Sequence, residues 1–163
     1  MKLRRGALLL MLAGLLAATA CAAPAATAPI SGNEPIPGTW VDAAVTGGEV
    51  SLPLSLVEQN VNTHFALAVD GRELAFMAYV LEDSLVVRAN ACPPCRSRGF
   101  ALDGDILVCD ACATTFDARD GSGIAGACVD YPKAEVSGRV VDGSLLMLME
   151  DLVTAYDETL VVG

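Results

Sequence analysis

Two closely spaced cysteine pairs place the strongest constraint on how this chain can fold. Cys92 and Cys95 form one Cys-x-x-Cys pair, Cys109 and Cys112 form another, and thirteen residues separate the two pairs. Two thiolates on one tight turn can point at the same metal ion, and a second such turn completes a tetrahedral sulfur site. A fifth cysteine, Cys128, follows a short glycine-rich stretch. The sequence therefore predicts a metal–sulfur site.

The identity of the metal is less constrained than its ligands. The spacing is similar to that of the cysteine turns in zinc ribbons, rubredoxin-type sites and some iron–sulfur proteins. Four thiolates favour zinc, a single iron ion or an iron–sulfur cluster over magnesium or calcium, which prefer oxygen. Zinc in a closed four-cysteine site would be structural, whereas iron would carry one electron at a time. Cys128 can be a fifth ligand, a replacement ligand, a buried thiol or half of a disulfide.

Disulfides are the competing explanation for these cysteines, because paired cysteines outside the cytoplasm commonly oxidise. The chain has six cysteines. If Cys21 is lipidated, five remain, and an odd number leaves one thiol unpaired. A bridge within a Cys-x-x-Cys pair also closes only a tiny loop, which is a poor way to connect distant segments. We therefore favour a metal site over a disulfide-stapled extracellular module.

The N-terminal residues have the pattern of an export signal. Lys2, Arg4 and Arg5 precede an uncharged, largely aliphatic run over residues 7–20. This run is shorter than the roughly twenty residues that a membrane-spanning helix needs. It ends in small residues directly before Cys21, which suits lipoprotein processing with Cys21 as the lipidated N-terminus. Ordinary signal-peptide cleavage at the same Ala-x-Ala is the alternative.

Three regions follow along the chain. We expect a signal peptide over residues 1–20, a lipidated cysteine and flexible linker over 21–46, and one folded metal-binding domain over 47–163. Residues 22–37 are rich in alanine, proline, serine and glycine without periodicity, as in a flexible spacer. The protein is expected at the outer face of the cytoplasmic membrane as a lipoprotein, or in the periplasm or outside the cell if it is not lipidated.

Short alternating segments separated by turn signals dominate the folded region. The expected strands cover residues 49–54, 64–69, 73–81, 85–89, 99–102, 106–108, 114–117, 138–141 and 145–149. A helical turn is expected over 55–60 and a short helix over 151–156. Two hairpins are expected to present the two cysteine turns at neighbouring tips. The predicted fold class is mainly β: a small single domain with a Rieske-like or zinc-ribbon-like metal subdomain of two cysteine knuckles.

Charge and the missing motifs exclude several functions. The formal net charge is −10 and no basic stripe exists, which argues against nucleic-acid binding. An acidic surface is compatible with a basic redox partner. His64 is the only histidine, lies far upstream of the cysteines and is expected to be structural. No nucleophile–histidine–acid set or nucleotide-binding loop is present. A non-catalytic electron carrier or metal-binding protein is therefore favoured over an enzyme.

Several segments together carry a family resemblance. They are Gly48–Ser55, His64-Phe65, Ala91–Cys95, Gly99-Phe100, Gly104–Cys112, Phe116-Asp117 and Gly126–Cys128. In this order they resemble the FtrD-like membrane iron–sulfur family over roughly residues 47–159. The resemblance implies an extracytoplasmic iron–sulfur protein for electron transfer, linked in some members to iron uptake. It also implies a cluster, expected to be [2Fe–2S], with Cys92, Cys95, Cys109 and Cys112 as ligands and Cys128 at the family's fifth cysteine.

The chain departs from the family pattern in two places. The family usually shows Gly-Gly-Cys-Asn-Pro where this chain has Gly126-Ala127-Cys128-Val129-Asp130. Some relatives have several membrane spans, and we expect a lipid anchor in their place here. The implied partners are the membrane and a redox or iron-transport protein. Phe100–Cys109 and Thr115–Gly121 are also distantly similar to Rieske domains, but the histidine ligands are missing and Cys112 stands where the second would be. Because histidine ligation raises the reduction potential, an all-thiolate cluster is expected to have a lower potential than a Rieske centre. The alternative function is a zinc-stabilised lipoprotein without redox activity.

Overall fold

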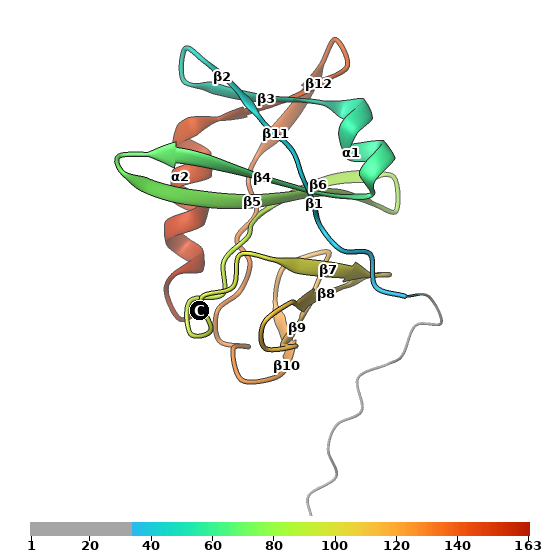
Figure 1. Ribbon diagram of the computed structural model, residues 1–163, viewed down its shortest axis with the longest axis vertical. Helices are drawn as coiled ribbons and strands as arrows, with labels where there is room; N and C mark the ends of the chain where they lie inside the picture. Colours follow the sequence, from blue (N-terminus) through green and yellow to red (C-terminus); the bar gives the residue numbers. More distant parts are fainter. Residues whose placement is uncertain (1–33) are drawn as a thin grey trace, which may run out of the picture.

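Three four-stranded β-sheets and two short helices make up the fold (Figure 1). The computed structural model describes residues 34–163. The expected signal peptide over residues 1–20, the lipidated Cys21 and the linker up to residue 33 lie outside the described residues. The sheets stack as an upper, a middle and a lower layer in the view of Figure 1. The prediction of a small, mainly β domain is confirmed.

The middle sheet has the strand order β1-β4-β5-β6. Its strands are β1 (Thr39–Trp40), β4 (Asn62–Val69), β5 (Arg72–Leu81) and β6 (Ser84–Ala89). β1 pairs with β4 in parallel, and the other pairs are antiparallel. Asp70 and Gly71 connect β4 to β5 with φ of +50° and +76°. Positive φ at both central residues is what a tight two-residue hairpin turn requires, so this turn sets the register of the longest pair.

The upper sheet has the order β11-β12-β3-β2 and is antiparallel throughout. Its strands are β2 (Ala44–Thr46), β3 (Glu49–Pro53), β11 (Gly138–Val141) and β12 (Ser144–Leu148). Helix α1 (Leu54–Asn60) follows β3, and helix α2 (Met149–Thr159) follows β12. Glu150 and Asp151 occupy the first turn of α2, where the helix dipole favours negative charge. The short helix expected over 151–156 is therefore present, and it is longer at both ends.

The lower sheet has the order β10-β9-β8-β7 and is also antiparallel. Its strands are β7 (Phe100–Asp103), β8 (Ile106–Cys109), β9 (Thr115–Asp117) and β10 (Gly123–Ala125). Ile36 exchanges two backbone hydrogen bonds with Leu102 of β7, at 2.8 and 2.9 Å. Together with β1 and β2, this bridge shows that residues 36–46 belong to the folded domain. The sequence places these residues in the linker, because their strands are too short to show an alternating pattern.

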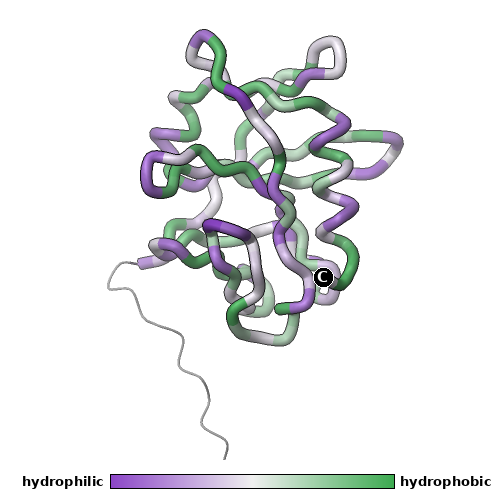
Figure 2. The backbone as a smooth tube through the Cα atoms, turned by 180° about the vertical axis from the view of Figure 1, so that it is seen from behind, coloured by the Kyte–Doolittle hydropathy of each residue, from purple (hydrophilic) through white to green (hydrophobic). Residues whose placement is uncertain are grey.

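The middle sheet is buried on both faces. Along β5, Phe76 and Ala78 belong to the core under the upper sheet, while Met77 and Tyr79 belong to the core above the lower sheet. Successive side chains of a strand point to opposite faces, so one strand contributes to both cores. Figure 2 shows the hydrophobic residues along the strands, whereas several turns are hydrophilic. A two-sided burial of this kind explains the nearly continuous apolar run in β5.

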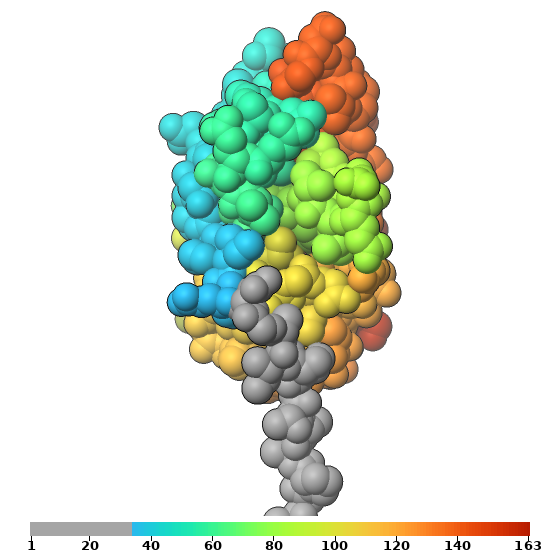
Figure 3. Space-filling model, turned by 90° about the vertical axis from the view of Figure 1, so that its right-hand side faces the viewer, coloured from blue at the N-terminus to red at the C-terminus, as the bar shows by residue number. Residues whose placement is uncertain are grey.

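The cysteines belong to only one of the two cores, the one between the middle and lower sheets. Seen from the side in Figure 3, the lower layer, in yellow and orange, lies directly beneath the green middle strands. The lower core contains Cys92, Cys109 and Cys128 together with Phe100 and Phe116. Within residues 34–163, none of the helices is long and apolar enough to cross a membrane.

Candidate metal centre

All five cysteines of the described part of the chain meet beside the lower sheet, and none of them is in a disulfide. The Sγ atoms of Cys92, Cys95, Cys112 and Cys128 lie within 4.8 Å of one another. The Sγ atoms of Cys112 and Cys128 are 3.7 Å apart. Cys109 lies outside this mutual set, but its Sγ is 3.6 Å from that of Cys95. The fold thus brings together every cysteine that the sequence predicts for the site.

The sulfur–sulfur distances fit thiolates that share a metal ion. Two thiolates bound to one tetrahedral ion at about 2.3 Å would lie about 3.8 Å apart. The 3.7 Å distance between the Sγ atoms of Cys112 and Cys128 agrees with this spacing. A disulfide would instead need about 2.05 Å between the sulfur atoms. The donor set therefore fits a thiolate-ligated metal or iron–sulfur cluster.

The first knuckle lies in the connection from β6 to β7 and so joins the middle sheet to the lower one. The backbone N–H of Cys92 donates to the Ser97 carbonyl at 2.9 Å, and the N–H of Arg96 donates to the Cys92 carbonyl at 2.7 Å. Arg96 has φ of +60°. The sequence predicts a hairpin here, which is wrong, because β6 and β7 belong to different sheets.

The second knuckle lies in the β8–β9 hairpin and repeats the same hydrogen bonds. The N–H of Cys109 donates to the Thr114 carbonyl at 2.9 Å, and the N–H of Ala113 donates to the Cys109 carbonyl at 2.9 Å. Ala113 has φ of +54° and stands four residues after Cys109, as Arg96 stands four residues after Cys92. The predicted subdomain of two cysteine knuckles is therefore present, with matching backbone geometry in both turns.

Thr114 joins the second knuckle to the loop that carries Cys128. Its side chain is fully buried. The Thr114 hydroxyl accepts the N–H of Cys128 at 3.3 Å and lies 3.2 Å from the sulfur of Cys112. Gly126 has φ of +119°, and a Cβ atom there would lie 2.6 Å from Thr114 Oγ1. Gly126 thus combines a backbone conformation and a close approach that a side chain would prevent.

The environment changes the pKa values of these thiols in different directions. Burial raises the pKa of Cys92 and of Cys109. Burial also acts to raise the pKa of Cys112, but hydrogen bonds from the side chain and backbone of Thr114 outweigh it and lower the pKa to about 6. In the metal-free protein, the lowered pKa favours the thiolate form of Cys112 at neutral pH, whereas metal binding at Cys92 must remove a proton.

Replacing Thr114 with valine is expected to lower the reduction potential of the iron-loaded protein. Valine keeps the shape of the side chain but cannot donate to the Cys112 sulfur, and such donors stabilise the more negative, reduced state. The loss of one buried hydrogen bond should also cost about 1 kcal/mol of unfolding free energy. A redox titration and urea unfolding measure the two effects. Thr114→Ser, which keeps the hydroxyl, should retain the potential, and an equal shift in both variants would contradict this role.

His64 has the structural role that the sequence predicts. It is buried in β4, and its ring meets the Trp40 ring edge-on with 5.3 Å between centroids. A Cβ atom on Gly38 would lie 2.0 Å from the imidazole, so the ring packs directly against that glycine. Burial lowers the pKa of His64 to about 4. The grouped metal-ligand atoms of residues 34–163 include only cysteine sulfurs.

Arg88 is a structural residue of the site that the sequence analysis does not identify. It lies in β6 between apolar neighbours, and its side chain is 1% exposed. The guanidinium donates to the carbonyls of Lys133, at 3.0 Å, and of Arg119. It also donates to Tyr79 Oη at 3.2 Å and forms an ion pair with Glu135 at 3.2 Å. Arg88 therefore ties the middle sheet to the two segments that flank the loop of Cys128.

Among solved structures, the chain is similar over part of its length to two ferredoxins and to a chain of an oxygenase–ferredoxin complex. The ferredoxin of carbazole 1,9a-dioxygenase from Nocardioides aromaticivorans IC177 is 24% identical, with a TM-score of 0.47 over 60% of this chain and 92% of that one. A complex of reduced oxygenase and oxidized ferredoxin in carbazole 1,9a-dioxygenase gives 18% identity and a TM-score of 0.45, over 53% and 81%. Sphingomonas yanoikuyae B1 ferredoxin is 21% identical, with a TM-score of 0.42 over 51% of this chain and 83% of that one.

No curated protein matches the sequence. A protein family does match, over residues 57–157, and its description is "Membrane iron-sulfur containing protein FtrD-like". The matched residues make up more than half of the chain and include all five cysteines of the site. The match therefore covers the lower sheet, the strands β4, β5 and β6 of the middle sheet and the complete sulfur group. By this match, the chain belongs to the FtrD-like family of membrane iron–sulfur containing proteins.

Proposed function

We propose that this protein transfers electrons through an iron–sulfur cluster held by Cys92, Cys95, Cys112 and Cys128. The observation that carries the proposal is the mutual proximity of these four sulfur atoms, all within 4.8 Å of one another. When bound, the cluster would supply one-electron oxidation and reduction. Four thiolates satisfy the ligand requirement of a [2Fe–2S] cluster, which is the form proposed here.

The ligand set differs from the sequence-based one at a single position. The spacing of the two pairs selects Cys109 as a ligand, whereas the mutual distances favour Cys128 in its place. In this assignment, Cys112 and Cys128, whose Sγ atoms are 3.7 Å apart, would hold the cluster on one side and the first knuckle would hold it on the other. The buried Cys109 then lines the site as a thiol, and its raised pKa fits that protonated state.

One side of the site is buried against aromatic residues, and the other side lies close to the solvent. Phe100 and Phe116 are fully buried against the cysteines and meet edge-on with 5.8 Å between ring centroids. Cys95 and Cys112 are only partly buried, so the site approaches the surface at the tips of the two knuckles. Electrons can enter and leave at this exposed edge, while the aromatic side excludes water from the rest of the site.

The partner is proposed to be a redox protein with a basic docking face. Three of the ten Lys and Arg residues lie within the first five positions, which leaves seven in residues 34–163 against twenty Asp and Glu. This charge imbalance favours a partner of opposite sign and repels acidic proteins. Export through residues 1–20, lipidation of Cys21 and a link to iron uptake complete the proposal. They place the electron transfer at the outer face of the cytoplasmic membrane.

The metal content of the purified protein tests this function. Protein prepared without oxygen should contain iron and acid-labile sulfide in equal amounts and little zinc. Stoichiometric zinc in a colourless protein would replace the proposal with a structural zinc site, which chelation would unfold. Neither metal, together with oxidised cysteines under denaturing conditions, would indicate a disulfide-stapled module instead.

A further inference from the structure

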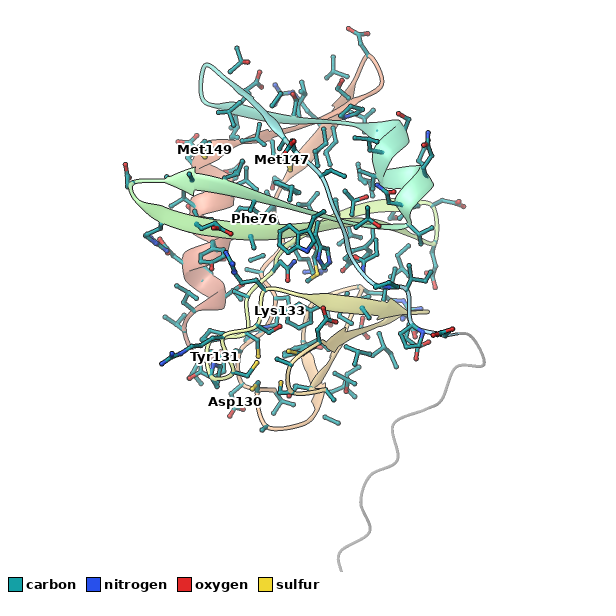
Figure 4. All side chains as sticks on the ribbon, in the orientation of Figure 1. Phe76, Asp130, Tyr131, Lys133, Met147 and Met149 are labelled. Carbon is teal, nitrogen blue, oxygen red and sulfur yellow. The ribbon has the colours of Figure 1, made fainter. Side chains whose placement is uncertain are left out.

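Lys133 is an unusual residue, because its side chain is completely buried beside the cysteines. It follows the loop of Cys128, and its backbone is fixed by hydrogen bonds to Gly121 and from Arg88. The Nζ atom donates to the carbonyl of Ala91, the residue before Cys92, at 2.8 Å. In Figure 4, Lys133 is labelled close to the sulfur atoms of the lower layer.

The aromatic residues of the lower core enclose this ammonium group. Nζ lies 4.3 Å from the ring centroid of Phe116 and 5.4 Å from that of Phe100. Phe100 pairs with Cys109 in the β7–β8 register, so the enclosure is continuous with the second knuckle. Lys133 therefore touches the start of the first knuckle through Ala91 and the sheet of the second knuckle through the two rings.

The charge of Lys133 has no carboxylate partner among the described residues. Each of the ion pairs in residues 34–163 uses an arginine, and the ammonium has a single hydrogen bond for its three donors. Burying an unpaired ammonium is strongly unfavourable unless another group supplies compensating charge. The two aromatic faces supply a part of it. The cysteine sulfurs of the same core, when ionised, are the negative charges that act on this ammonium.

Negative charge on the cysteine sulfurs would offset the cost of burying the ammonium of Lys133. Burial lowers the pKa of Lys133 to about 8, while thiolates at the proposed ligands Cys92, Cys128 and Cys95 act to raise it again. The same attraction acts on the sulfurs, because a buried cation favours negative charge at neighbouring groups. A chain that only needed to fill this space could do so with an uncharged side chain of equal length.

We propose that Lys133 is the internal counter-charge of the sulfur site and sets its reduction potential as a positioning and electrostatic residue. The inference rests on the proposed function, since it concerns the cluster held by the same cysteines. Reduction adds one negative charge to the site, no bond forms or breaks, and the ammonium keeps its proton. Lys133 therefore stabilises the reduced state more than the oxidised state and raises the potential. Lys133 also slows the loss of metal, because the negative charge of the iron-loaded site compensates the buried ammonium.

Two neutral variants separate charge from packing and hydrogen bonding. Lys133→Met keeps the length of the side chain and its apolar contacts, and Lys133→Gln keeps a donor for the Ala91 carbonyl. Arg139→Met is the matched control, because Arg139 is exposed in β11 of the upper sheet, where it pairs with Glu49. Redox titrations of the iron-loaded protein give the potential, and release of iron to a chelator gives the stability of loading. Circular dichroism verifies that each variant is folded.

Both Lys133 variants should have a lower potential than the unmodified protein and should release iron several-fold faster, while Arg139→Met changes neither. An unchanged potential in a folded, iron-loaded Lys133→Gln or Lys133→Met variant would overturn the inference and leave the proposed function intact. A wild-type protein that holds no iron would instead overturn the proposed function, and this inference with it. A potential that falls equally in Arg139→Met would show an effect of net charge alone and would also overturn it.

Discussion

Serine in place of Cys128 is expected to abolish loading with iron and sulfide. In the proposed ligand set, this change removes one of four thiolates and leaves an iron without its second cysteine. Mutation of a residue that hydrogen-bonds to a metal ligand typically lowers the affinity for the metal by about 10- to 100-fold. The loss of a ligand itself should lower the affinity further. Iron and sulfide analysis after anaerobic purification, with the visible spectrum, measures the result.

The matched control is Cys109→Ser. Cys109 is as buried as Cys128 and lies in the same core, but its sulfur is outside the mutual set of four. This variant should retain iron and sulfide close to the wild-type level. The reverse result, with iron retained in Cys128→Ser and lost in Cys109→Ser, would contradict the distance-based assignment. It would restore the two Cys-x-x-Cys pairs as the ligands.

Replacing Arg88 with leucine is expected to destabilise the domain by about 3–5 kcal/mol. The buried guanidinium donates to the carbonyls of Ala118, Arg119 and Lys133, and leucine would leave them without these donors. Because these carbonyls flank the loop of Cys128, the variant should also lose iron more readily. Urea unfolding monitored by circular dichroism gives the change in unfolding free energy.

Arg72→Leu serves as the comparison for this substitution. Arg72 is about half exposed and pairs with Asp157 at 2.5 Å on the surface. Exposed ion pairs contribute about 1 kcal/mol or less, so this variant should remain close to wild type. A loss below about 1 kcal/mol in Arg88→Leu would show that water satisfies the freed carbonyls. The hydrogen bonds of Arg88 between the middle sheet and the segments that flank the Cys128 loop would then be unnecessary for stability.

The strands of this protein were predictable because most of them alternate and end at recognisable turns. The segments expected over 64–69, 73–81 and 138–141 correspond to β4, β5 and β11, with small differences at their ends. The Asp70-Gly71 turn also lies where the sequence predicts it. The sequence did not predict the strands β1, β2 and β10, which contain only two or three residues and therefore show no clear alternation.

The position of the cysteines along the chain predicted the knuckles but not how they are held. Alternation shows that a strand has two faces, but it does not say that the middle sheet is covered on both. That layering turns the first knuckle into a crossover between sheets instead of a hairpin. Arg96 and Ala113 adopt positive φ where glycine would be the usual signal, so the matching backbone of the two turns was hidden.

The residues that support the site were the least predictable part. Thr114, Arg88 and Lys133 are polar or charged, and such residues are mostly exposed in proteins, so an isolated sequence gives no reason to place them inside. One signal was available for Arg88, which stands among valine and alanine in a predicted strand. Lys133 has no such signal, because its burial depends on the lower core and on the loop of Cys128 folding around it.

Reversible one-electron titration of the anaerobically purified protein tests the central claim most directly. The protein should show broad visible bands of thiolate-ligated iron–sulfur, and these should bleach on reduction and return on oxidation with one electron for each cluster. The reduced protein should also give a paramagnetic resonance signal that integrates to one spin per cluster. Iron-loaded protein that neither bleaches nor gains a signal at any accessible potential would contradict electron transfer as the function of this site.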